Sequence, residues 1–281
     1  MVHTKRTKPE LIIIKLGGSV ITYKNSPVPK VRLLVIRQLA KQIHQLHKTG
    51  YQFILIHGAG SFGHPLAKKY NLTNGFQDEN SYLGFWETIV SMKTLNTIIT
   101  KILQGIGIHT LSLPPHVFIT QTNGKLDNFD VSIIQNLLDK NIMPVLYGDP
   151  VIDKTLGCSI LSGDVIIPYL ARKFKTSRII FLSDVDGIFD DDPRKNPKAK
   201  LIPKITNQNF EKVLNGIKST DRDDVTGEMR GKIISIKDHL QKTEVIIANG
   251  FMDQVITRIT SGNGTGSMLY FDPPQYHRRH D

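Results

Sequence analysis

Short apolar runs alternate along this chain with longer stretches that have the apolar spacing of helices. The runs are Leu11–Leu16, Phe53–Ile56, Thr110–Leu113, Pro144–Leu146, Ile179–Leu182 and Val245–Ala248. The expected helices are Val31–Lys48, Ser81–Leu103, Val131–Leu138 and Gly163–Phe174, with Gln254–Ile259 either a helix or a short turn. This alternation predicts an α/β fold in which helices cover both faces of a central, mainly parallel sheet. Ligands of such folds bind beyond the C-terminal ends of the strands, so the residues that follow each run matter most.

Three segments are expected to be loops because they are rich in polar residues, glycine or proline: Tyr23–Lys30, Gln121–Asn128 and Asp190–Pro203. No internal repeat or low-complexity linker divides the chain. Its 281 residues therefore predict one continuous domain, with a lobe boundary near Lys175.

Composition excludes several classes of protein. With 40% hydrophobic and 22% charged residues the chain is globular rather than disordered, and its single cysteine, Cys158, excludes a disulfide framework or a multi-cysteine metal site. No apolar run approaches the ~18 residues of a membrane span, and residues 1–9 lack the apolar core of a signal peptide. We therefore expect a cytoplasmic protein without a membrane partner.

The net charge of +11 raises the question of a nucleic-acid partner. The excess lies partly in the two tails and is otherwise scattered, and no basic block has aromatic residues between its charges. A solvated basic surface is the favoured interpretation, and no nucleic-acid partner is expected.

Two glycine-rich loops follow the first two apolar runs. They are Lys15-Leu16-Gly17-Gly18-Ser19 and His57-Gly58-Ala59-Gly60-Ser61-Phe62-Gly63-His64. Glycine lets backbone amides approach a phosphate closely, and a following helix N-terminus favours negative charge. Two such loops in tandem, one with a lysine and one with histidines, suit two phosphate groups that face each other.

The second loop also matches the spacing of a dinucleotide-binding fingerprint, Gly58-x-Gly60-x-x-Gly63. That fingerprint normally follows the first strand and expects an acidic strand end about 20 residues later. Here the loop follows the second run, and the sequence before Asp78 is typical of a loop. The dinucleotide hypothesis is therefore the weaker of the two.

Three further loops follow later elements. Ser162-Gly163-Asp164 opens a predicted helix, where capping alone would also explain the serine and the aspartate. Ser183–Gly187 contains two aspartates but lacks the glycine and glutamate positions of a calcium loop. Asp224–Lys232 is a glycine-bearing loop that enters a helix and ends in a lysine.

These loops, in this order, resemble the amino acid kinase superfamily, and within it most nearly the isopentenyl phosphate kinases. The resemblance extends from Lys15 to about Leu269, and its most specific part is Ser61-Phe62-Gly63-His64. It implies a three-layer αβα sandwich of the acetylglutamate kinase type. Residues 10–175 would form an N-terminal lobe with the phosphate-acceptor site and the dimer contact, and residues 176–270 a C-terminal lobe with the ATP site.

The resemblance also implies a role for individual residues. The catalytic set would be Lys15, Lys24, His64, Asp164 and Lys232. The acceptor phosphate would contact Ala59, Gly60, His64 and Gly163. ATP, with Mg²⁺, would contact Lys15, Leu16, Gly17, Gly18, Ser19, Gly60, Asp184, Gly227 and Lys232. The implied acceptor is isopentenyl phosphate, the implied assembly is a homodimer, and no metal ligands of the protein's own are implied.

The sequence departs from the family pattern at two positions. Ala59 replaces the middle of three glycines that many relatives have, and its methyl group is tolerable if the residue has a negative φ. Glu228 stands where a second glycine is usual, which puts the nucleotide contact at that loop in doubt.

The proposed chemistry agrees with general principles. Phosphoryl transfer depends on positioning and charge stabilisation, which three lysines would supply. A phosphate monoester with a second pKa of about 6 is already largely dianionic at neutral pH, so it needs no general base. His64 would then donate a hydrogen bond to the acceptor, although a structural cap of the turn is the alternative, and His57 is expected to be structural.

An isoprenoid tail needs an apolar surface, which the helix with Phe85, Trp86, Ile89, Met92 and Leu95 could supply if these residues are not simply core. A kinase of another phosphate or phosphonate, such as fosfomycin, and a non-catalytic nucleotide sensor or storage protein on the same fold are the alternatives.

Overall fold

The computed structural model describes residues 9–24, 26, 28–217 and 225–273. The strands are β1 (Leu11–Leu16), β2 (Gln52–His57), β3 (Thr110–Ser112), β4 (Ile119–Thr122), β5 (Lys125–Phe129), β6 (Met143–Tyr147), β7 (Asp149–Asp153), β8 (Gly157–Leu161), β9 (Thr176–Ser183), β10 (Lys204–Ile205), β11 (Glu244–Asn249) and β12 (Ser267–Leu269). The helices are α1 (Gly18–Ile21), α2 (Leu33–Lys48), α3 (Gly60–Lys69), the short 3₁₀ helix η1 (Leu72–Asn74), α4 (Glu79–Gly105), α5 (Pro115–Phe118), α6 (Ser132–Asp139), α7 (Gly163–Lys173), α8 (Phe210–Gly216), α9 (Val225–His239) and α10 (Val255–Thr260).

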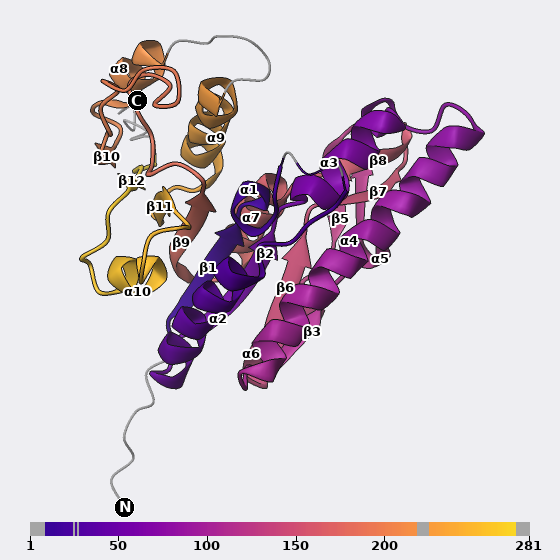
Figure 1. Cartoon of the computed structure of the whole chain (residues 1–281), viewed down its shortest axis with the longest axis horizontal. Helices are drawn as coiled ribbons and strands as arrows, with labels where there is room; N and C mark the ends of the chain where they lie inside the picture. The colour runs from indigo at the N-terminus through magenta and orange to yellow at the C-terminus, as the bar shows by residue number, and fades with distance from the viewer. Residues whose placement is uncertain (1–8, 25, 27, 218–224, 274–281) are drawn as a thin grey trace, which may run out of the picture.

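All six predicted strands join one large sheet. Within the described residues its order is β10-β12-β11-β9-β1-β2-β6-β3, and only the β11–β12 pair is antiparallel. In Figure 1 the long helix α4 runs along the β6–β3 side, and α8, α9 and α10 lie on the opposite side of the molecule. The predicted mainly parallel α/β fold is confirmed.

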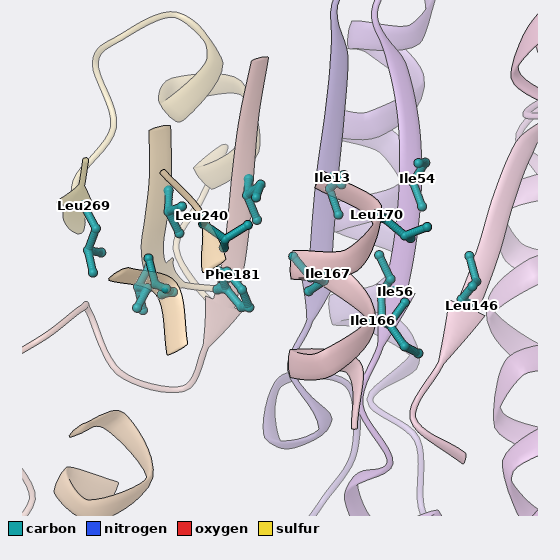
Figure 2. Packing of buried hydrophobic residues seen from close by; sticks show 14 of the residues in the cluster. Ile13, Ile54, Ile56, Leu146, Ile166, Ile167, Leu170, Phe181, Leu240 and Leu269 are labelled. Carbon is teal, nitrogen blue, oxygen red and sulfur yellow. The ribbon is translucent and has the colours of Figure 1, made fainter. Parts of the chain in front are cut away.

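Alternate residues of each central strand enter different cores. Ile13 of β1 packs with Ile54 of β2 and with residues of α6, α7, α8 and α9, whereas Ile12 and Ile14 pack with residues of α2, α3, α4 and α10. Figure 2 shows the first core, where Ile13 lies beside the apolar face of α7. The strands are apolar on both faces because helices cover both, and this produces the three layers.

The segment Gln121–Asn128, expected to be a loop, was predicted wrongly. It is the greater part of an antiparallel hairpin, β4–β5, which joins β7 and β8 in a second, four-stranded sheet. Its turn is Asn123-Gly124, both with positive φ, at 51° and 72°. Polar residues obscured these strands in the sequence, but the Asn-Gly pair is a typical hairpin turn.

Asp153 organises the turn of this hairpin. Its carboxylate accepts hydrogen bonds from the backbone N–H groups of Asn123 and Gly124 at 2.9 and 2.7 Å, and from those of Thr155 and Leu156 at 2.9 and 3.0 Å. Burial raises the pKa of Asp153, but the four donors more than offset this, so the net pKa lies well below the usual range. A charged carboxylate therefore holds the hairpin turn in place, while Ile119, Phe129, Val151 and Leu161 of the same sheet join the first apolar core.

The other predicted strands and helices agree closely with the structure, but the segment 225–232, expected to be a loop, is the first half of α9. The predicted long helix is α4, and the predicted helix at Gln254–Ile259 is α10, one residue shifted. Within the described parts of the chain, no helix has both the length and the apolar character to cross a membrane.

Candidate active site

The two glycine-rich loops lie against each other, backbone to backbone. β1 and β2 pair in parallel with Leu16 opposite His57, so both strands end at the same level. A Cβ atom added to Gly18 would lie 2.4 Å from the backbone nitrogen of Gly60, and one added to Gly58 would lie 2.7 Å from that of Gly18. These positions must therefore be glycine for the loops to approach this closely.

Thr22 ties the two loops together. Its Oγ1 donates to the carbonyl oxygen of Gly18 at 2.7 Å and accepts from the backbone N–H of Ser61 at 3.0 Å. The residue is fully buried, at 0% exposure. Sequence reasoning gave Thr22 no role, because a lone threonine after a short turn does not reveal a partner 39 residues away.

Ala59, which stands where many members of the family have glycine, is accommodated without backbone strain. Its φ of −78° is the negative value that an alanine needs at this position. It directly precedes α3, whose first residue is Gly60 with a φ of +51°. The replacement of a glycine by Ala59 therefore leaves the loop able to present its amides.

A charged cluster lies at the N-terminus of α7. The ammonium of Lys15 lies 2.7 Å from the carboxylate of Asp164, and the Oγ of Ser162 accepts from the Asp164 N–H at 3.2 Å. Ser162 is thus the helix cap that the sequence predicted, and Asp164, in the first turn of α7, pairs with Lys15. Gly163 keeps the space open, because a Cβ there would lie 3.0 Å from Ile56 and 3.5 Å from Lys15.

Lys232 approaches the same cluster from α9. The Nζ atoms of Lys15 and Lys232 lie 5.9 and 5.6 Å from the centre of the Phe181 ring. Burial raises the pKa of Asp164, but the positive charges of Lys15 and Lys232 outweigh burial, so the net pKa is lowered. Two of the three predicted catalytic lysines therefore share one carboxylate, which remains ionised at neutral pH.

The third lysine, Lys24, lines a cavity of about 710 Å³ together with Ser19 and Asp184. Its remaining lining residues are Tyr23, Ser26, Lys30, Arg32, Arg194 and Phe251. Arg194 pairs with Asp184 at 2.6 Å. Four cationic side chains and one carboxylate give this cavity a net positive charge that suits a polyanionic ligand.

The remaining predicted residues lie on two helices and in the turn after β1. His64 is an exposed residue of α3, four positions after Gly60. Gly227 lies in the first turn of α9, on the same helix as Lys232, whereas Asp224 lies outside the described residues. Gly17, at the end of β1, donates its N–H to the carbonyl oxygen of Leu182 at 2.9 Å, which fixes the first loop against β9.

A comparison with protein-family models shows to which family the chain belongs. The model of the amino acid kinase family matches residues 10–249. The chain belongs to the amino acid kinase family. It is accordingly a kinase that uses ATP, and the expected fold class and family resemblance are both confirmed.

Individual members of the amino acid kinase family are also similar to this chain. The isopentenyl phosphate kinase of Methanothermobacter thermautotrophicus is 33% identical, over 92% of this chain and 95% of its own length. That of Methanocaldococcus jannaschii is 35% identical, over 93% of this chain and 99% of its own length.

Solved structures agree with these relatives. A crystal structure of an isopentenyl phosphate kinase superposes with a TM-score of 0.79 at 30% identity, covering 92% of this chain and all of the other. An aspartate kinase from Synechocystis, at 16% identity and a TM-score of 0.64, shares the fold of the family only.

Proposed function

We propose that this protein transfers the terminal phosphoryl group of ATP to isopentenyl phosphate, forming isopentenyl diphosphate. The principal support is the direct backbone contact between the two glycine loops, of which the second continues into α3 with His64. Two phosphate groups bound at adjoining loops would face each other, as transfer requires. The similar proteins named as isopentenyl phosphate kinases favour this acceptor over other small phosphates.

The lysines would divide the work of charge stabilisation. Lys15, with Leu16 and the backbone of Gly17–Ser19, would hold the phosphates of ATP, and Lys232 would reach them from α9. Lys24, from the cavity wall beside Ser19, would bridge donor and acceptor and stabilise the phosphoryl group in transit. Asp164 would keep the Lys15 ammonium in place, which the 2.7 Å ion pair supports.

The acceptor side needs a hydrogen-bond donor rather than a base. A phosphate monoester is already largely ionised at pH 7, with a second pKa of about 6. His64 would donate to that phosphate, beside the backbone N–H groups of Ala59 and Gly60 and next to Gly163.

The nucleotide side would include Asp184 and Gly227. Mg²⁺ would enter with ATP as part of the nucleotide substrate and neutralise its phosphates. The described residues contain no cluster of three or more histidine, cysteine or acidic side chains that could hold a metal ion of the protein's own.

We further propose that residues 10–175 form the acceptor lobe and that residues 176–270 form the ATP lobe. The acceptor loop and His64 lie in the first segment, and Asp184, Gly227 and Lys232 lie in the second. A cytoplasmic homodimer that pairs through the N-terminal half completes the proposal, on the strength of the family resemblance.

The decisive experiment is an ADP-release assay with isopentenyl phosphate, dimethylallyl phosphate, fosfomycin, UMP and acetylglutamate as acceptors. We expect the highest kcat/KM with isopentenyl phosphate. A higher value with fosfomycin would favour a phosphonate kinase, and ATP binding without turnover on any acceptor would favour a nucleotide sensor.

The matched variant is Lys24→Ala. If Lys24 stabilises the transferring group, the substitution lowers kcat by about 100-fold or more and leaves the Kd of ATP within about threefold. Exchange of Lys198, an exposed lysine of the 190–203 segment, for alanine removes the same charge and should change neither value.

A further inference from the structure

His57, the last residue of β2, is fully buried, at 0% exposure, and each of its ring nitrogens has a hydrogen-bond partner. Its Nδ1 lies 3.1 Å from the carbonyl oxygen of Gly58, and its Nε2 lies 3.1 Å from the amide nitrogen of Asn96 on α4. Its ring stacks on that of Tyr147, with centres 5.1 Å apart and planes 18° apart. The ring is therefore fixed both in position and in rotation.

These partners determine where the proton of His57 resides. A carbonyl oxygen only accepts, so Nδ1 must hold the proton, and the Asn96 amide donates, so Nε2 must be bare. Burial lowers the pKa of His57 to about 4, although the hydrogen bond to Gly58 opposes this. The imidazole is therefore neutral at pH 7, with its one donor and its one acceptor both in use.

The bond to Gly58 also determines the direction of the next amide. In a trans peptide the C=O and N–H groups point in opposite directions, and the described chain contains no cis peptide. Because the Gly58 carbonyl faces the buried ring, the Ala59 N–H faces away from it. Ala59 directly precedes α3, where N–H groups are available to an anion.

We propose that His57 is a positioning residue, which holds the Gly58–Ala59 peptide so that the Ala59 N–H points at the acceptor phosphate. This inference rests on the proposed function, because the acceptor site is the one assigned there to the second glycine loop. Helix α4 is the support of the arrangement. It hydrogen-bonds to the loop region through Asn96 and through Ser91, whose Oγ donates to the Phe62 carbonyl at 2.7 Å.

Two substitutions separate positioning from packing. In His57→Asn the amide nitrogen stands where Nδ1 stood, so the bond to Gly58 is kept, whereas His57→Gln places its amide where Nε2 stood and loses that bond. We expect the KM for isopentenyl phosphate to rise about tenfold in His57→Gln, as for one lost hydrogen bond. In His57→Asn the KM should stay close to that of the unaltered protein. The Kd of ATP should stay the same in both.

The control is a buried hydrogen bond of the same core away from the loop. Gln42 accepts from the backbone N–H of Ile256 at 2.8 Å, so Gln42→Leu should lower the melting temperature without changing the KM for the acceptor. An equal rise of KM in both His57 variants, or no rise in either, would overturn the proposal.

Two measurements do not depend on turnover. Nitrogen-15 NMR of the unaltered protein should find the His57 proton on Nδ1, and a proton on Nε2 would overturn the proposal even if the variants do not fold. Calorimetric titration with inorganic phosphate should give a higher Kd for His57→Gln than for His57→Asn and the unaltered protein, in the same order as the KM values for the acceptor. If the unaltered protein does not phosphorylate isopentenyl phosphate, the proposed function fails. The phosphate titration still tests whether His57 directs the Ala59 N–H at a bound phosphate.

Discussion

Gly18→Ala is the most direct test of the contact between the glycine loops. The added methyl group would lie 2.4 Å from the Gly60 nitrogen and 2.7 Å from the Gly60 Cα, where ordinary contact begins at 3.4 Å. Both obstacles are backbone atoms, so the loops must separate by about 1 Å. Overpacking of this kind costs ~1–3 kcal/mol of unfolding free energy, and a 1 Å displacement of reacting groups can cost ~100-fold in rate.

The assay compares kcat/KM from ADP release with the unfolding free energy from urea denaturation. We expect kcat/KM to fall about 100-fold at 25 °C, far more than the change in folded fraction explains. Gly105→Ala is the matched control: a Cβ there meets nothing within 4 Å, at the exposed end of α4. It should leave activity unchanged and stabilise the helix by up to ~1 kcal/mol. A Gly18→Ala enzyme within about threefold of the unaltered activity would refute the reasoning.

Three other substitutions test the charges of the molecule. Asp153→Asn removes a buried carboxylate with a lowered pKa. Some of the backbone N–H groups that donate to it would then lose their acceptor, so the unfolding free energy at pH 7 should fall by ~1–3 kcal/mol. The stabilisation by Asp153 is fully present above its unfolded pKa of ~4 and is lost only as the pH falls towards its lowered pKa in the folded protein. The difference between the urea curves of the two proteins should therefore begin to narrow below about pH 4 and narrow further with each step to lower pH. Asp164→Asn leaves Lys15 and Lys232 without their shared counter-charge, so kcat should fall about tenfold or more while ATP, measured by calorimetry, binds at least as tightly. His64→Ala should raise the KM for the acceptor about tenfold with the Kd of ATP unchanged, and an unchanged KM would leave the imidazole without a role in acceptor binding.

Six strands of the large sheet were predictable because they are apolar runs that end in distinct turns, whereas the short edge strands β10 and β12 were not predicted. The run Leu11–Leu16 coincides with β1, and the glycines after it mark the contact with the second loop. The β4–β5 hairpin was not, since its residues are mostly polar and its order derives from Asp153, which lies about 30 residues away along the chain. Polar strands held by a distant carboxylate leave no periodic apolar pattern to detect.

Part of the arrangement of the candidate site was likewise predictable. The sequence placed Lys15 and Asp164 in one site by resemblance, and the structure pairs them at 2.7 Å. It did not suggest Thr22 as the tie between the loops, nor Asn96 as the partner of His57, 39 residues away. Such contacts arise only when the layers pack, because each residue alone is an ordinary buried polar group.

Backbone atoms of Gly18, Gly58 and Gly60 meet directly at the junction between the first loop and the second, and the buried Thr22 side chain joins them. The distance between the two bound phosphates would then depend mainly on the spacing of neighbouring strands, which substitutions in the cavity wall leave unchanged. Acceptor preference and transfer geometry become separable properties of the enzyme. An altered wall can admit a longer or bulkier alcohol phosphate while the reacting oxygens keep their alignment, which makes this scaffold a suitable starting point for engineering new acceptors.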